Sequence, residues 1–285
     1  EEGLDPVTAI RMATLNAAEC FDLKDRGAIA PGYRGDVVLL DDLKDFHVNR
    51  VFVEGALVAE EGKYLPEIKK CDISTVKGSV IVKDFSKEKF KMNLKSNKVN
   101  VIKILPGGVV TAKDTAEIEL DANGEFVRNP EVDLVKVAVV ERHQGTGNVA
   151  CGFLKGYGIK EGAVALSVAH DSHNIIVVGV NDEEMEFAVN SLIEQEGGIV
   201  LVKEGKVIES MPMPIAGLMS DQSGEWVDQK LTDIHEKAYE ELGICGDVEP
   251  VMTLCFMSLA VIPEIKLTDM GLFDVTTFSF IPVEV

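Results

Sequence analysis

The sequence feature that most constrains the fold is a strand, helix, strand succession between residues 163 and 202. Two strongly apolar segments, Ala163–Ala169 and Ile175–Val180, are typical of buried strands. A helix capped by Asp182 and ended by Gly197-Gly198 follows, and then a third apolar strand, Ile199–Val202. The apolar face of the helix consists of Met185, Ala188, Val189, Leu192 and Ile193. This order predicts a right-handed crossover and a sheet that is at least partly parallel.

The flanking sequence extends this prediction to a mixed α/β domain. Further strands are predicted at Val99–Leu105, Gly108–Thr111 and Val132–Val140, and a long helix at Gly224–Leu242. The longest apolar run, Val251–Ile262, is too short for a membrane crossing, which needs about 20 residues. It is therefore predicted to be a buried strand or core segment.

The opening of the chain has a different pattern. Asp5 and Pro6 predict the start of an amphipathic helix, and short strands are predicted at 37–40, 48–53 and 57–59. No earlier strand is present for this helix to cover, so the start is expected to be a truncation. A shift to polar, Lys-rich sequence places a domain boundary near Pro66, which gives predicted domains at 1–66 and 67–285.

Composition excludes several classes of partner and site. Lys and Arg number 28 against 48 Asp and Glu, so the formal net charge is −20 and nucleic acid and anionic membranes are not expected as partners. The five cysteines are widely spaced and form no Cys-x-x-Cys pair, which argues against disulfides and a thiolate zinc site. We expect them to be reduced and mostly buried. No secretory signal opens the sequence, and a cytoplasmic location is predicted.

Short motifs near the start are similar to those of one enzyme superfamily. They are Asp5-Pro6-Val7-Thr8-Ala9-Ile10, Ala13-Thr14-Leu15-Asn16-Ala17-Ala18, Gly27-Ala28-Ile29, Pro31-Gly32 and Gly35-Asp36-Val37-Val38-Leu39. They resemble the end of an amidohydrolase-superfamily enzyme, in which the last helix of a (β/α)8 barrel leads back to a small β-sandwich. The resemblance implies that residues 1–66 are the closing helix of such a barrel and part of a small β-sandwich.

Five further motif blocks lie in the rest of the chain. They are Ala138–His143, Gly145-Thr146-Gly147, Ala169–Asn174, Pro214–Ser220, and Ile265–Asp269 with Gly271-Leu272. In this order they resemble the C-terminal domain of adenine deaminases. The resemblance implies a C-terminal α/β domain with a mixed sheet, in an enzyme that hydrolyses adenine to hypoxanthine and ammonia. It also implies a divalent metal centre, manganese or iron, in the barrel of the intact enzyme.

The most polar motif interrupts two apolar strands. It consists of His170, Asp171, Ser172, His173 and Asn174. A connection this short holds its side chains near one sheet end, where ligand sites form. Together with the resemblance, this favours a substrate-binding or water-excluding role for His170, Asp171, His173 and Asn174, and for His143. Two alternatives stay open. Either the polar side chains only hydrogen-bond to the backbone of a turn, or His170 and His173 bind a metal.

Two other polar motifs have competing interpretations. Glu141-Arg142-His143 ends a strand before the Gly145-Thr146-Gly147 loop, whose backbone can pass close to a ligand. Its alternative is a surface ion pair beside a flexible turn. The acidic cluster Asp182-Glu183-Glu184 is interpreted as helix-start chemistry matched to the macrodipole and not as a catalytic site.

The residues that would hold the metal in the resembled superfamily are missing from this sequence. There is no His-x-His pair, so no catalytic or metal-binding residue and no bound metal are expected in this chain, which alone is predicted to be inactive. The resemblance implies a purine substrate and an N-terminal barrel portion as partner, in a homo-oligomer. Two other functions are kept as alternatives. One is an assembly module with a large apolar surface near Val251–Ile262 or the Trp226 helix, and the other is an independent histidine-based metal-binding domain.

Overall fold

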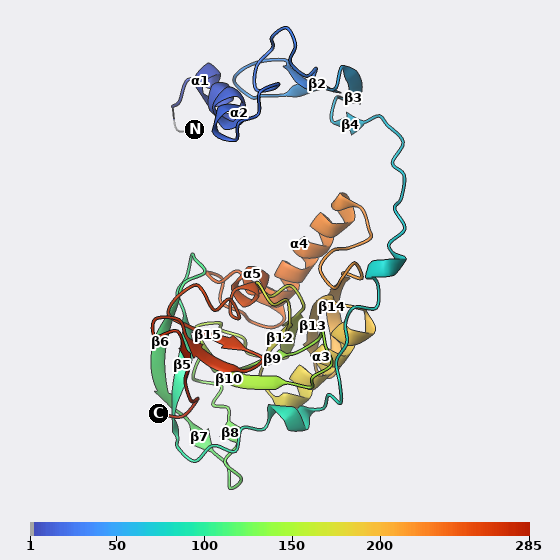
Figure 1. Ribbon diagram of the computed structural model, residues 1–285. Coiled ribbons are helices and arrows are strands. Elements are labelled where there is room, and N and C mark those ends of the chain that lie inside the picture. The colour runs from blue at the N-terminus through green and yellow to red at the C-terminus, as the bar shows by residue number, and fades with distance from the viewer. Residues whose placement is uncertain (1–2) are drawn as a thin grey trace. The chain divides into compact units, whose positions relative to one another are not determined.

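The structure is a computed structural model that describes residues 3–285, and it forms two compact units that divide between Cys71 and Asp72 (Figure 1). The domain boundary near Pro66, with the assignments made on each side of it, stays a prediction. None of the helices among residues 3–285 combines the length and apolar character that a membrane crossing needs.

The first unit is a helical segment followed by a small sheet. The helix runs through α1 (Pro6–Arg11), a π-helical turn (Met12–Asn16) and α2 (Ala17–Cys20), and the Asp5 carboxylate caps it by accepting the Thr8 N–H at 2.9 Å. The antiparallel sheet has the order β1 (Val37–Leu40), β2 (Val48–Val53), β3 (Ala56–Glu60), β4 (Lys63–Tyr64). The helix and the three predicted strands are confirmed.

The first unit buries few of its own apolar side chains. Ala18 is the one buried residue in the described range 3–71, whereas Phe21 and Ile29 are 76% and 89% exposed. A pocket of about 710 Å3 lies between the helix and the sheet, lined by residues that include Ile10, Val38 and Phe46. This unit therefore has an uncovered apolar face.

The second unit is built on an eight-stranded sheet with the order β14-β13-β11-β12-β9-β10-β5-β6. The strands are β5 (Lys98–Ile104), β6 (Thr111–Glu117), β9 (Leu134–Val140), β10 (Val149–Lys155), β11 (Ala163–Leu166), β12 (Ile175–Gly179), β13 (Gly198–Lys203) and β14 (Lys206–Pro212). In the described chain β5 and β10 are the one directly parallel pair. β12 and β13 also point the same way, since both run antiparallel to β11 between them. The predicted mixed α/β fold with a mixed sheet is confirmed.

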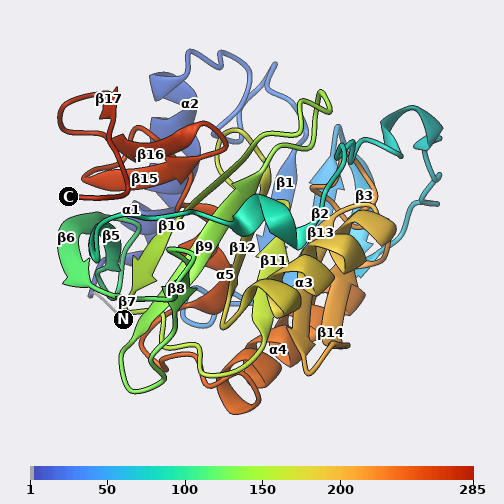
Figure 2. The same ribbon diagram turned by 90° about the horizontal axis from the view of Figure 1, so that it is seen from below.

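Both faces of this sheet are covered. Figure 2 shows α3 (Asp182–Glu194) lying on one face. The helix buries the side chains of Met185, Ala188, Val189 and Leu192 against it. The other face is covered by α4 (Gly224–Glu240), α5 (Pro250–Cys255), and a small sheet of β15 (Ile265–Thr268), β16 (Gly271–Asp274) and β17 (Ser279–Phe280). The strands between them are buried on both sides, which explains their continuous apolar runs.

The remaining elements are short. The hairpin of β7 (Glu119–Leu120) and β8 (Phe126–Val127) follows β6. Residues 72–97 contain two 3-10 turns, Ser74–Val76 and Lys87–Phe90, and no strand, as expected for a polar stretch without a clean period.

Several local predictions are wrong for identifiable reasons. The α3 cap is Asn181, whose side chain accepts the Glu184 N–H at 2.8 Å, and Asp182 is instead the first helical residue. The predicted strand Gly108–Thr111 is a turn, and β6 begins only at Thr111. The segment Val251–Ile262 was predicted to be a buried strand or core segment. Pro250 instead starts a short helix there, and the first half of the segment is buried in the core.

The cysteine prediction is corrected in one respect. All five thiols are free, but Cys20 and Cys71 are exposed, and only Cys255 is fully buried.

Candidate functional site

The five motif blocks of the second unit converge at one end of the eight-stranded sheet, which we name the motif end. It is the end at which β9, β11 and β14 finish and β10, β12 and β13 begin, as the antiparallel pairings require. Four connections meet there: 141–148, 167–174, 213–223 and the turn between β15 and β16. The hydrogen bonds described next join all four.

The polar loop 170–174 connects β11 to β12 and is held mainly through its backbone. The His170 N–H donates to the Cys255 carbonyl at 2.8 Å, and the His170 carbonyl accepts the Ser258 hydroxyl at 3.3 Å. The His173 N–H donates to Ala169 at 2.6 Å. This arrangement leaves the Asp171 carboxylate exposed and the His170 side chain 38% exposed, with its ring stacked at 4.8 Å from Phe256. Hydrogen bonds thus fix the backbone of the loop, while the side chains of His170 and Asp171 stay accessible.

His143 comes beside this loop from the neighbouring connection. One ring nitrogen, Nε2, lies 2.7 Å from the Ser172 carbonyl oxygen. The Glu141 carboxylate organises the His143 turn, because it accepts the N–H groups of His143, Gln144 and Thr146 at 2.6, 2.8 and 2.9 Å. His143 therefore lies beside loop 170–174, and its role stays a prediction.

Arg142 is a site component that the sequence did not indicate. It is only 1% exposed, and its guanidinium donates from Nε to the His173 carbonyl at 2.5 Å and from Nη2 to the Ala216 carbonyl at 3.2 Å. It thus bridges loop 170–174 to the Pro214–Ser220 motif. The alternative interpretation of Glu141-Arg142 as a surface ion pair is wrong, because both residues are buried and contact different partners.

Asn174 links the polar loop to two other segments of the motif end. It is buried, and its side chain accepts the Arg142 N–H at 3.3 Å and donates to the Asp269 carboxylate at 3.2 Å. Asp269 also accepts from the Asn148 amide at 3.4 Å. The β15–β16 turn is thereby joined to the polar loop, and it brings a carboxylate that was not among the predicted site residues.

The electrostatics of the loop favour a neutral imidazole at His173. Burial lowers the pKa of His173, the neighbouring His170 and Arg142 act in the same direction, and the opposing effect of Asp171 is smaller. His173 is thus neutral at pH 7, when its imidazole can both donate and accept a hydrogen bond. The rings of His170 and His173 lie 5.6 Å apart between centroids.

The metal that the resemblance implies belongs to the barrel of the intact enzyme and not to the motif end. Within residues 3–285 no three His, Cys, Asp or Glu side chains come together in a group that could hold a metal ion. The motif end can bind through imidazole, amide and carboxylate hydrogen bonds, and we derive no metal-dependent step from it.

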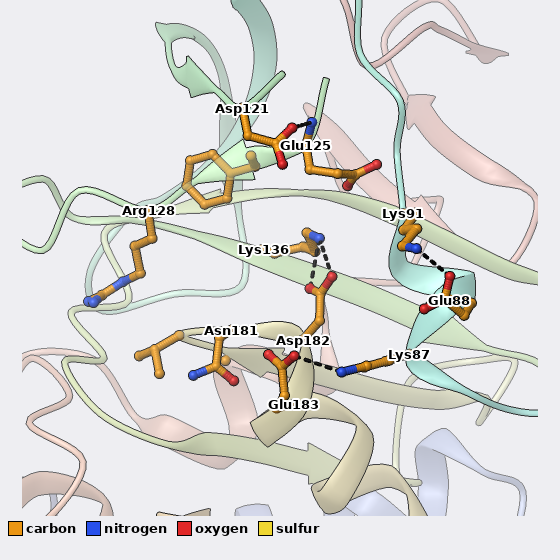
Figure 3. A pocket seen from close by; sticks show the side chains of 13 residues that line it. Lys87, Glu88, Lys91, Asp121, Glu125, Arg128, Lys136, Asn181, Asp182 and Glu183 are labelled. Carbon is orange, nitrogen blue, oxygen red and sulfur yellow. Dashed lines mark hydrogen bonds and ion pairs between the residues drawn. The ribbon is translucent and has the colours of Figure 1, made fainter. Parts of the chain in front are cut away.

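A separate pocket of about 570 Å3 lies at the opposite end of the sheet, beside the start of α3 (Figure 3). Its charged side chains pair with one another: Lys136 binds Asp182 at 2.7 Å, Lys87 binds Glu183 at 2.8 Å, and Lys91 binds Glu88. None of the predicted site residues lines it. The pairing neutralises most of its charge, and the pocket adds nothing to the motif end.

Comparison with known proteins gives two family matches. Residues 108–279 match the adenine deaminase C-terminal domain, and residues 1–58 match the amidohydrolase family. "Adenine deaminase 2" of Desulfotalea psychrophila is 66% identical over 284 residues, which cover 100% of this chain and 49% of the relative. "Adenine deaminase" of Ligilactobacillus salivarius is 48% identical over 284 residues, with the same coverage. The chain thus spans about half the length of the relatives it matches.

Proposed function

Because the chain belongs to the adenine deaminase family, we propose that the protein to which this sequence belongs hydrolyses adenine to hypoxanthine and ammonia. In this reaction the oxygen of water forms a bond to C6 of the purine, the bond from C6 to the exocyclic nitrogen breaks, and ammonia leaves after protonation. The names of the relatives and the motif blocks that this chain shares with that family support this activity.

In this proposal the two predicted domains have separate roles. Residues 1–66 are the closing helix of a barrel and part of a small β-sandwich, and residues 67–285 are the C-terminal domain. The uncovered apolar face of the first unit supports this division, because exposed side chains such as Phe21 and Ile29 favour a packing partner. We propose that this partner is the half of the relatives that the chain does not match.

The divalent metal, manganese or iron, is proposed to be held outside the residues described here. The similarity of residues 1–58 to the amidohydrolase family supports a divalent metal in the intact protein. This chain would then contribute binding and exclusion of water and not the attacking oxygen. The alternative of an independent histidine-based metal domain is not favoured, because no three potential ligands gather at this loop within residues 3–285.

The observation that carries the proposed role of the C-terminal domain is the convergence of all five motif blocks at the motif end. We infer that His170, Asp171, His173 and His143 bind the purine or exclude water there, and that Asn174 holds the loop. A neutral His173 suits this role, since a purine presents both donors and acceptors on its edge. The rigid backbone favours binding in a fixed geometry.

The test is alanine replacement of His170 and His173 in the full-length protein. Each replacement should lower kcat/KM for adenine at least tenfold while the thermal unfolding midpoint changes little. His235→Ala is the matched control, because this histidine lies on α4 and pairs with Glu249 away from the motif end. Kinetics unchanged in both loop variants would remove the proposed role, and a wild-type protein that does not release ammonia from adenine would remove the proposed reaction.

A cytoplasmic, homo-oligomeric protein completes the proposal. The free thiols support a reducing location. The surface predicted for the assembly alternative is largely absent, because Val251, Leu254 and Cys255 are buried and Trp226 packs against the core. We therefore favour substrate contact over a purely assembling role for this domain.

A further inference from the structure

Arg142 is unusual because its positive charge is buried without an acidic partner. The residue is 1% exposed, and within residues 3–285 no carboxylate lies in ion-pair distance of its guanidinium. Burial lowers the pKa of this group. Burying an unpaired charge costs folding free energy, and apolar residues of similar volume are often as stable in such positions. Stability alone therefore gives no reason for an arginine here.

The two carbonyl groups that Arg142 binds belong to residues with an unusual backbone conformation. His173 has a φ of 52° and Ala216 a φ of 57°, both in the left-handed region that residues other than glycine seldom adopt. Such conformations cost of order 1–3 kcal/mol each and persist only where the surroundings hold them. The bonds from Nε to His173 at 2.5 Å and from Nη2 to Ala216 at 3.2 Å supply that constraint from one rigid planar group.

The neighbouring glycine fits the same arrangement. A Cβ atom at Gly217 would lie 2.7 Å from Arg142 Nη1, so only a glycine leaves room for the guanidinium. Gly217 in turn accepts the Ser167 hydroxyl at 2.6 Å through its carbonyl. The Pro214–Ser220 motif is thereby shaped around Arg142.

We propose that Arg142 is a positioning residue of the substrate site, and that its guanidinium sets the backbone of loop 170–174 and locks it to the Pro214–Ser220 motif. The inference rests on the proposed function, because Arg142 would hold the loop in the position in which its imidazoles contact the purine. The guanidinium itself touches no substrate.

The positive charge has a second effect on the same loop. Burial is the largest effect that lowers the pKa of His173. Among the neighbouring groups His170, Arg142 and His143 act in the same direction, and Asp171 opposes them. Arg142 thus contributes to keeping this ring neutral at the pH where the loop would bind. This effect separates a positioning role from a role in folding, because it can be measured at His173 directly.

The experiment compares Arg142→Met and Arg142→Lys in the full-length protein. The Met variant removes the charge, whereas the Lys variant keeps it but cannot bond two carbonyls with the fixed fork. Both should lower kcat for adenine at least tenfold with a smaller change in KM. Only the Met variant should raise the pKa of His173, measured by NMR of histidine labelled with 13C at Cε1 and assigned with a His173→Asn variant.

Arg128→Met is the matched control, because Arg128 also donates to a carbonyl, that of Ile159 at 3.0 Å, outside the motif end. It should leave kcat and the His173 pKa unchanged. Wild-type kcat in both Arg142 variants, or a lowered kcat with an unmoved His173 pKa in the Met variant, would overturn the proposal.

These outcomes are distinct from failure of the proposed function. If His170→Ala and His173→Ala lose activity while the Arg142 variants do not, the function stands and the positioning role is wrong. If the wild type does not act on adenine, amide exchange at Ser172 and His173 and the His173 pKa still test Arg142. Both readouts should change in Arg142→Met, and no change would reject the role. Should Arg142→Met not fold, the Lys variant tests the role through its kcat and loop exchange.

Discussion

Replacement of Glu141 by Gln should loosen the turn that carries His143. The Glu141 side chain is buried at 6% exposure, and its two oxygens accept four hydrogen bonds from residues 143–146. Each oxygen takes two of them. In Glu141→Gln one oxygen becomes an NH2 group, which cannot accept a hydrogen bond, so two of the four bonds are lost. The new NH2 group also points at the groups that donated to the oxygen it replaces.

The size of the effect follows from the pKa of Glu141. Burial acts to raise this pKa, but the hydrogen bonds outweigh burial and lower it from 4.5 to about 2. The difference corresponds to about 3 kcal/mol of stability held by the charged form at neutral pH. Because the folded pKa is depressed, this stability is complete above about pH 4.5 and is lost as the pH falls towards 2. Since Gln keeps two bonds, we expect a loss of about 2–3 kcal/mol at pH 7.

Amide hydrogen exchange of the full-length protein measures this loss locally. At pH 7 the protection of the His143, Gln144 and Thr146 amides should fall on the order of 100-fold in Glu141→Gln. Glu236→Gln, at an exposed position of α4, should leave them unchanged. The difference in thermal midpoint between wild type and Glu141→Gln should shrink from pH 5 to pH 2. A change of less than threefold in the protection of all three amides at pH 7 would refute the reasoning.

Two further predictions concern groups whose pKa burial shifts and whose side chains make none of the contacts described at the motif end. Lys266 is fully buried, its ammonium donates to the Val109 carbonyl at 3.0 Å, and burial lowers its pKa to about 8. The unfolded chain thus binds more protons between about pH 8 and 10.5, so Lys266 makes stability rise with pH in this window. Lys266→Met should flatten that rise in denaturant titrations, and an equal slope in both proteins would contradict it. Burial also raises the pKa of Cys151 and Cys255 to about 12, so both thiols should react with iodoacetamide at pH 8 at least about 100-fold more slowly than free cysteine. Labelling of Cys255 in the folded protein at the free-cysteine rate would disprove this expectation.

The elements found from the sequence are those whose signal is local. β11, β12, α3 and α4 have long apolar runs or a clear helical period, and they lie where they were predicted. β6 was missed because it is an edge strand in which polar residues such as Lys113 and Asp114 dominate. The cap of α3 was misplaced by one residue because Asn181 and Asp182 are chemically equivalent as caps.

The site was predictable only in part, because its geometry depends on distant contacts. Loop 170–174 was identifiable as a polar interruption between apolar strands. The partners that fix it lie 32 and 95 residues from Asn174, at Arg142 and Asp269. Nothing in the local sequence around Arg142 distinguishes a buried guanidinium from a surface charge. The one available signal was that Arg142 and Asp269 lie in motif blocks.

The strand order of the large sheet also has a consequence for colloidal behaviour. β6 and β14 are its outermost strands (Figure 1), and both carry groups that oppose sheet extension by another chain. Lys113, Asp114 and Glu117 place charges along β6, and β14 ends in Pro212, which has no N–H to donate. Neighbouring molecules are thus discouraged from pairing strand to strand at β6 and β14, so the two edges of the large sheet should resist fibrous extension.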